Sequence, residues 1–268
     1  MKDYNAFYTR NIGIFSQEEQ QKLKNACVFI AGVGGAGGIQ ASTLARMGIG
    51  ELIIMDPHVF DEPDFNRQFG AMKSTLGKNK AISTGHLLNG IAPFTKVTVY
   101  NKVLDESELR KEISRCDLVV DAIDLSTFDF KAVFARIARE FNKYNLSCPI
   151  PDFTAILINF DPEGVTFEDY TELKTFPPMT DYAIDKYLNS KNYNQNGIPF
   201  FSSKSTNSAT SALSGAFLAS EVALILTGKR EKKDIVVVPE VTSIDLLSRK
   251  VKTFNPEKEL TSIIERNI

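Results

Sequence analysis

The sequence predicts an α/β protein: a Rossmann-like, doubly wound, mostly parallel sheet with an antiparallel C-terminal extension. Short apolar runs, such as Cys27–Ala31 and Leu52–Met55, alternate with segments of helical periodicity, which favours parallel strands joined by helices. The glycine-rich segment Gly32–Gly38 lies between the first run and a helical stretch. This is the order of strand, turn and helix in a nucleotide-binding unit.

The composition limits the classes of protein to consider. The chain has 268 residues, of which 43% are hydrophobic and 24% charged, with a net charge of -2, so a globular domain with a large core is expected. Nearly balanced charge gives no electrostatic reason to expect nucleic acid or an anionic membrane as the main partner. The first twenty residues lack an apolar stretch, and the apolar segment 210–228 contains Glu221. We therefore expect a cytoplasmic protein in which that segment is a buried helix.

Local signals define the elements of the first half. The N-terminal segment Tyr4–Ile14 is expected to be extended, and Ser16 with Glu19 forms a capping box that starts a helix over 17–25. Periodicity places the other elements. Strands are expected at 27–31, 51–55, 96–100 and 118–122, and helices from the glycines to about 47 and at 78–89, 107–115 and 128–142.

The second half is expected to complete the same domain. Ala155–Phe160 and Val165–Phe167 flank a turn sequence and predict a hairpin. Residues 170–209 are rich in Asn, Ser, Thr, Tyr and Pro, which indicates a long excursion with a short helix near 182–188. Beyond it we expect a helix over 210–227 that ends at Gly228, then strands at 235–238 and 241–247 and a polar tail.

The glycine segment is a candidate nucleotide site. Gly32, Gly34 and Gly37 match G-x-G-x-x-G, and Asp56 ends the next apolar run. Such glycines let phosphates approach backbone N–H groups, and such an acid can bind ribose hydroxyls. The kind of nucleotide stays open at this point, and so does a glycine turn that binds nothing.

Two cations farther along favour a triphosphate. Arg67, within Asn66-Arg67-Gln68, and Lys80 follow the glycine unit. A pair of cations suits the charge of a triphosphate held for in-line displacement better than that of a dinucleotide diphosphate. The alternative is that both are solvated surface charges.

Three aspartates, Asp117, Asp121 and Asp124, lie before, within and after the strand expected at 118–122. Asp124 falls at the carboxyl edge of the sheet, where open α/β folds bind ligands and where an acid can hold Mg²⁺ on phosphates. Asp117 and Asp121 are interpreted as solvent-facing or structural.

Together these motifs resemble the ubiquitin-activating-enzyme-like adenylyltransferases, the ThiF/MoeB/HesA family. The resemblance covers residues 7–169 and, more weakly, 211–256. The matching pieces are Tyr8-Thr9-Arg10, the Gly32–Gly37 turn, Asp56, Asn66-Arg67-Gln68, Gly77-x-x-Lys80 and the aspartate run that ends at Asp124.

The resemblance implies a role for each matching position. The nucleotide-binding set would be Gly32, Gly34, Gly35, Gly37, Asp56, Asn66, Arg67, Gln68, Lys80 and Asp124. Within this set, Asp56 would bind the ribose and Asp124 would hold Mg²⁺. Arg67, Lys80 and Asp124 would be catalytic, together with Arg10, which would reach the partner's ATP site across the interface of a homodimer.

The implied reaction is the attack of a carboxylate on the α-phosphate of ATP, giving an acyl adenylate and pyrophosphate. The carboxylate would be the C-terminus of a ubiquitin-like or sulfur-carrier protein, a peptide, or a small acid linked to RNA. Residues 170–209 contain no cysteine, which favours direct transfer over a thioester relay. The implied organisation is an adenylation core at 1–169, a variable substrate loop at 170–209, and elements at 210–268 that complete the same domain.

Several departures from the family pattern matter. No CxxC pair is present, so no zinc is expected, and Cys148 is interpreted as a buried hydrophobe. His58 stands where a second acid is common, Asp64 where Asn is usual, and Leu125 where another Asn is common. These changes keep open a degenerate member that acts as a scaffold. An NAD-dependent oxidoreductase is a further alternative, but it leaves the cations without a role.

Overall fold

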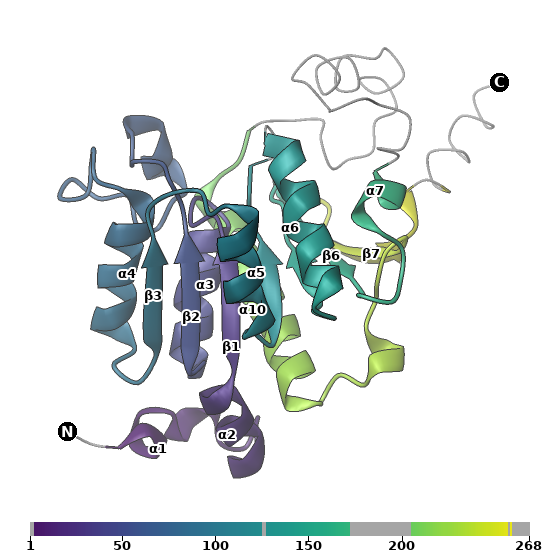
Figure 1. Ribbon diagram of the computed structural model, residues 1–268, viewed down its shortest axis with the longest axis horizontal. Coiled ribbons are helices and arrows are strands. Elements are labelled where there is room, and N and C mark those ends of the chain that lie inside the picture. Colours follow the sequence, from purple (N-terminus) through teal and green to yellow (C-terminus); the bar gives the residue numbers. More distant parts are fainter. Residues whose placement is uncertain (1–2, 125–126, 172–204, 257, 259–268) are drawn as a thin grey trace.

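A computed structural model describes residues 3–124, 127–171, 205–256 and 258 (Figure 1). Its centre is an eight-stranded sheet with the order β3-β2-β1-β4-β5-β6-β7-β8. The strands are β1 Cys27–Ala31, β2 Glu51–Met55, β3 Lys96–Tyr100, β4 Leu118–Asp121, β5 Asn145–Ser147, β6 Thr154–Phe160, β7 Val241–Asp245 and β8 Lys250–Phe254. The first five strands of this order, from β3 through β2, β1 and β4 to β5, pair in parallel. Strands β6, β7 and β8 continue the sheet with antiparallel pairing. The predicted fold class is confirmed.

Helices cover both faces of the sheet (Figure 1). The helices are α1 Tyr4–Phe7, α2 Gln17–Asn25, α3 Gly37–Met47, α4 Lys80–Ile91, α5 Glu106–Ser114, α6 Phe128–Glu140, α7 Phe167–Tyr170 and α10 Ser208–Thr227, with 3-10 helices η1 Thr9–Asn11, η2 Glu62–Asn66 and η5 Lys232–Asp234. Val28 and Ile30 of β1 belong to a core that includes α3, α4 and α10, whereas Phe29 faces a second core with α5 and α6. This division follows from the alternation of side chains along a strand.

The N-terminal arm is helical, and the prediction of an extended segment was wrong. Asp3 caps α1 by accepting a hydrogen bond from the Ala6 N–H. Tyr4 and Tyr8, one helical turn apart, bury their rings and donate to the carbonyls of Gly48 and Ala45. Anchoring by two tyrosines at helical spacing explains the compact arm.

The predicted hairpin is also wrong. Its first arm is β6, but the chain after Val165 forms α7, because Thr166 caps that helix by accepting from the Asp169 N–H. This N-cap contact outweighs the strand preference of the neighbouring Val and Phe. β6 instead pairs with β5 and β7.

The last strands differ from the expectation as well. The segment 235–238 is not a strand, because the chain turns there, with the Glu240 N–H donating to the Val237 carbonyl. The predicted 241–247 strand is β7, and β8 lies in what was expected to be a polar tail. Most residues of β8 are exposed and need not be apolar, so its sequence lacks the apolar run that identifies a buried strand. The helix predicted near 182–188 lies outside the described residues.

Helix α10 is a core element, as predicted. It ends at Gly228, whose φ of 80° is the left-handed conformation of a C-cap glycine. Its length and composition also meet the test for a membrane span, as core helices can. Leu218 and Val222 belong with Leu44 of α3 to one apolar core, and a Cβ at Gly215 would lie 2.7 Å from Ile39. α10 and α3 therefore pack closely.

Candidate functional site

The glycine turn between β1 and α3 is tightly packed against the end of β4. Gly32 has a φ of 89°, and a Cβ there would lie 2.4 Å from the Ala122 carbonyl oxygen. A Cβ at Gly37 would lie 1.9 Å from the Gly32 carbonyl oxygen. Both positions therefore require glycine. The N-cap residue of α3, Ala36, makes no side-chain cap hydrogen bond. Its side chain therefore does not compete with an anion for the backbone N–H groups at this helix N-terminus.

Asp56 joins the glycine turn to the end of β2. Its carboxylate accepts hydrogen bonds from the N–H groups of Val33 at 3.0 Å and His58 at 2.9 Å. The residue is only 5% exposed. Each carboxylate oxygen has a further lone pair, so Asp56 retains acceptor capacity beside the turn, where the sequence predicts ribose binding.

Two residues of the predicted nucleotide-binding set lie over the turn. A Cβ at Gly35 would be 3.3 Å from Arg67 Nε, and one at Gly34 would be 3.6 Å from Gln68 Oε1. That amide oxygen is buried and has no hydrogen-bond partner among the described residues. The structure thus brings together parts of the predicted site that lie more than thirty residues apart in the sequence.

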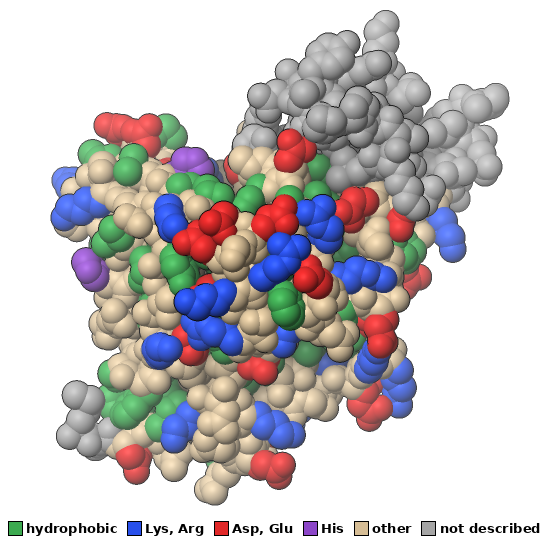
Figure 2. Space-filling model, viewed as in Figure 1, with side chains coloured by type: hydrophobic (Ala, Val, Ile, Leu, Met, Phe, Trp, Pro, Cys, Tyr) green, Lys and Arg blue, Asp and Glu red, His purple; other side chains and the backbone are tan. Residues whose placement is uncertain are grey.

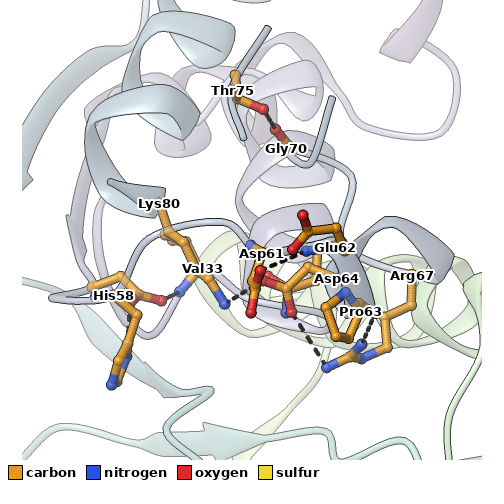
Figure 3. Close-up of polar contacts among 12 residues, drawn as sticks. Val33, His58, Asp61, Glu62, Pro63, Asp64, Arg67, Gly70, Thr75 and Lys80 are labelled. Atoms are coloured by element: carbon orange, nitrogen blue, oxygen red, sulfur yellow. Dashed lines mark hydrogen bonds and ion pairs between the residues drawn. The ribbon is translucent and has the colours of Figure 1, made fainter. Parts of the chain in front are cut away.

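Asp64 lies between the two predicted cations (Figure 3). Its carboxylate forms ion pairs with Lys80 Nζ at 3.0 Å and Arg67 Nη2 at 3.7 Å. It also accepts from the Asp61 N–H at 3.1 Å and from the Gln68 amide. Sequence reasoning identified Asp64 as a departure near the phosphates, but not as the partner of both cations.

Lys80 is held at the start of α4 by a residue that sequence reasoning passed over. Asn79 caps the helix by accepting from the Ile82 N–H, and its amide donates to the Asp56 carbonyl at 3.0 Å. The Lys80 N–H donates to the His58 carbonyl, and the side chain is 12% exposed. The ribose and phosphate residues are therefore connected through Asn79. The N-cap preference of Asn before a helix was the available signal.

A buried ion pair supports the end of β4. Lys131 Nζ lies 2.7 Å from Asp121 and 3.2 Å from the Ile123 carbonyl, while the Asp121 carboxylate also accepts from the Ile123 N–H. Asp121 is thus structural, as interpreted from the sequence. Asp124 follows directly and is exposed at the carboxyl edge of the sheet, with its carbonyl accepting from Thr127.

Two further residues of the predicted site are exposed. Arg10 is exposed in η1, in the arm that contacts the C-terminal end of α3, roughly 16 Å of helix from the turn at 1.5 Å per residue. Within one chain it does not join the site, because the arm contacts the opposite end of α3 from the glycine turn. Asn66 is exposed, and its amide donates to the Thr206 carbonyl at 3.0 Å, while its oxygen accepts from Arg67.

The three cysteines are buried and form no disulfide bond. Burial raises the pKa of the Cys148 thiol to about 12, and an exposed thiolate is what a reactive cysteine needs. This agrees with the structural role expected for Cys148. Cys27 and Cys116 place their sulfurs 3.3 Å apart inside the second core.

The described residues offer few metal ligands. Among them, no three His, Cys, Asp or Glu side chains gather as a metal site. A single exposed carboxylate such as Asp124 nevertheless fits Mg²⁺, which is commonly held by one or two carboxylates together with substrate phosphates.

On the surface, acidic and basic side chains are interspersed over the face in view (Figure 2).

These features define an α/β protein in which Arg67 and Gln68 lie against a glycine turn at a helix N-terminus. The ThiF family model matches residues 8–262, and the chain belongs to the ThiF family. The family match spans nearly the whole chain, including the C-terminal region where the sequence resemblance was weaker.

Curated relatives match about two fifths of the chain. The molybdopterin-synthase adenylyltransferase of Escherichia coli is 34% identical over 119 residues, 44% of this chain and 48% of that protein. The adenylyltransferase and sulfurtransferase UBA4 of Candida albicans is 35% identical over 41% of this chain and 25% of its own length. The tRNA threonylcarbamoyladenosine dehydratase of Bacillus subtilis is 31% identical over 44% of this chain and 46% of its own length. The matches thus span half or less of these relatives.

Solved structures share the fold over almost the whole chain. E. coli MccB with ATP covers 95% of this chain and 73% of that chain, with a TM-score of 0.72 and 22% identity. PaaA covers 94% of this chain and 73% of that chain, with a TM-score of 0.71 and 18% identity. At this level of identity the likeness establishes the fold alone.

Proposed function

We propose that the chain is an adenylyltransferase that uses ATP and Mg²⁺ to activate a carboxylate as an acyl adenylate. The observation that carries this proposal is the position of Arg67 and Gln68 against a glycine turn at a helix N-terminus, with Lys80 joined to them through Asp64. Relatives of the same family carry the adenylyltransferase name. A dinucleotide site would leave this cluster without a function.

The chain's own residues suggest how the reaction proceeds. The glycine turn and the N-terminus of α3 would bind phosphate oxygens, and Asp56 would orient the ribose. A carboxylate oxygen of the substrate would attack the α-phosphorus, the bond to the bridging oxygen would break, and pyrophosphate would leave. Arg67 and Lys80 would offset the negative charge of the transferring phosphates. Asp124 would hold Mg²⁺, which would supply further positive charge to the phosphates.

No protein nucleophile is needed for this step, because the substrate supplies it. The substrate class follows the family: the C-terminus of a small carrier protein or a peptide. One solved relative, MccB, was crystallised with MccA. Direct transfer to the acceptor, a homodimer with Arg10 completing the partner's site, a zinc-free chain and a cytoplasmic location belong to the same proposal.

A degenerate scaffold is the second candidate, and one observation favours it. Asp64 neutralises part of the positive charge that ATP would use. A scaffold would neither turn over ATP nor depend on Lys80.

ATP–pyrophosphate exchange with Mg²⁺ and pooled carboxylates, including carrier-protein C-termini and peptides, tests the proposal. We expect exchange in the wild type and its loss in Lys80→Ala and Asp124→Ala. Lys78→Ala is the matched control, since Lys78 is an exposed lysine two positions away, and it should keep its exchange. Calorimetry with Mg²⁺ and ATP gives a second readout that does not require the carboxylate. A wild type that does not bind ATP would exclude the adenylyltransferase and favour the scaffold.

A further inference from the structure

Asp64 is a buried acid in the midst of the proposed phosphate-binding groups. The residue is 8% exposed, and four donors surround its carboxylate. These are Lys80 Nζ, Arg67 Nη2, the Asp61 N–H and the Gln68 amide. An ionised carboxylate accepts hydrogen bonds and donates none, and the four groups around Asp64 are all donors.

The charge of Asp64 opposes the task of its neighbours. Arg67 and Lys80 together offer two positive charges to a triphosphate, and Asp64 reduces the sum to one. Charges in a partly buried cluster are screened less than those on an open surface. A polyphosphate bound beside Arg67 and Lys80 would therefore be repelled by Asp64, and the repulsion would grow with the charge of the ligand.

We infer that Asp64 determines how tightly this site holds polyphosphates, acting as the counter-ion of Lys80 that weakens the binding of ATP and of pyrophosphate. This inference rests on the proposed function, in which both ligands occupy the site. Weaker binding of pyrophosphate favours its release after adenylation. Asp64 acts through Lys80 and Arg67 and is not itself a catalytic residue.

The structure indicates that Asp64→Asn is a well-behaved test of this role. Asparagine has the same shape, but its amide would bring a donor to a cluster of donors. Gln68 can compensate, because its Oε1 is buried and unpartnered. Rotation of the Gln68 amide would turn that oxygen toward the introduced N–H group, while the introduced amide oxygen still faced Lys80 and the Asp61 N–H. The variant then removes the charge and keeps the hydrogen bonds.

The experiment is calorimetric titration of the full chain with AMP, ADP, ATP and pyrophosphate in the presence of Mg²⁺. We expect Asp64→Asn to bind ATP and pyrophosphate about tenfold more tightly than the wild type, ADP less so, and AMP nearly unchanged. A structural role alone would not rank the ligands by charge. Asp64→Asn in a Lys80→Met background should also bind ATP more tightly than Lys80→Met alone.

Asp105→Asn is the matched control. It removes the same charge from an exposed aspartate that caps a different helix, α5, and should change the affinity for ATP less than twofold. Asp64→Ala repeats the test without an added amide if Asp64→Asn melts at a lower temperature.

The outcomes separate the two proposals. If the wild type binds ATP but neither Asp64 variant binds ATP more tightly, the proposed role of Asp64 is wrong. The proposal that the chain is an adenylyltransferase is not affected by that result. A wild type that does not bind ATP overturns both.

Discussion

Lys131 pairs with Asp121 inside the protein, and its replacement by methionine should be severely destabilising. The two side chains are 7% and 2% exposed, and their charged atoms lie 2.7 Å apart. Methionine keeps most of the aliphatic volume but removes the charge. Asp121 would then keep the Ile123 N–H at 3.1 Å as a hydrogen-bond donor, and the Ile123 carbonyl would lose the Lys131 ammonium.

The cost follows from leaving a buried charge uncompensated. Breaking one partner of a buried ion pair costs about 3–5 kcal/mol, out of a total stability of about 5–15 kcal/mol for a typical domain. We therefore expect Lys131→Met to lower the free energy of unfolding by about 3–5 kcal/mol. Adding Asp121→Asn to Lys131→Met should recover a large part of this lost stability, because no unpaired buried charge then remains.

Urea denaturation followed by circular dichroism at pH 7 measures this change. Lys111→Met is the control, since Lys111 is an exposed lysine on the neighbouring helix α5, and it should change stability by less than about 0.5 kcal/mol. A Lys131→Met protein within about 1 kcal/mol of the wild type would refute the reasoning, and so would a double variant less stable than Lys131→Met.

Two further predictions concern stability. Gly37→Ala should lower the free energy of unfolding by more than about 3 kcal/mol, because its Cβ would lie 1.9 Å from the Gly32 carbonyl oxygen. Gly90 is exposed in α4, and a Cβ there would have nothing within 4 Å, so Gly90→Ala should raise the free energy of unfolding by about 0.5–1 kcal/mol. Urea denaturation that ranks the two variants the other way would contradict this. Burial raises the pKa of Tyr4 to about 12 from 10.0, so the folded protein holds the phenol proton more tightly than the unfolded chain. That contribution to stability is complete below pH 10 and is lost as pH rises toward 12. Urea melts between pH 8 and 11 should show the decline, and an equally steep decline in Tyr4→Phe would disprove the assignment.

Much of the fold could be predicted because its signals are local. An apolar run identifies a buried strand, and the pair Ser16 and Glu19 identifies the start of α2, without knowledge of the rest of the chain. The failures lie where a local preference was overridden or absent. The Thr166 cap overrode the strand pattern of Val165–Phe167, and exposed β8 had little apolar pattern to read.

The candidate site was predictable as a set of residues but not as an arrangement. Motif spacing singled out Lys80 and Arg67, yet their shared contact with Asp64 depends on how the loop between β2 and α4 folds. Lys131 left a visible signal, since it lies on the same stripe of α6 as buried Phe134 and Ala138. Its partner Asp121 could not be inferred, because that pairing depends on the packing of α6 against β4.

The position of α10 also determines when this protein can fold during synthesis. β1, α3 and β2 are complete by residue 55, but the core they share with α10 needs Leu218 and Val222. Until the ribosome has released that helix, the face of the central sheet that α3 and α4 also cover lacks part of its apolar cover. The partner of β6, β7, is synthesised later still. Contacts between such distant segments slow folding and prolong the exposure of apolar surface. A nascent chain should therefore expose apolar surface until the segments that form α10 and β7 have emerged.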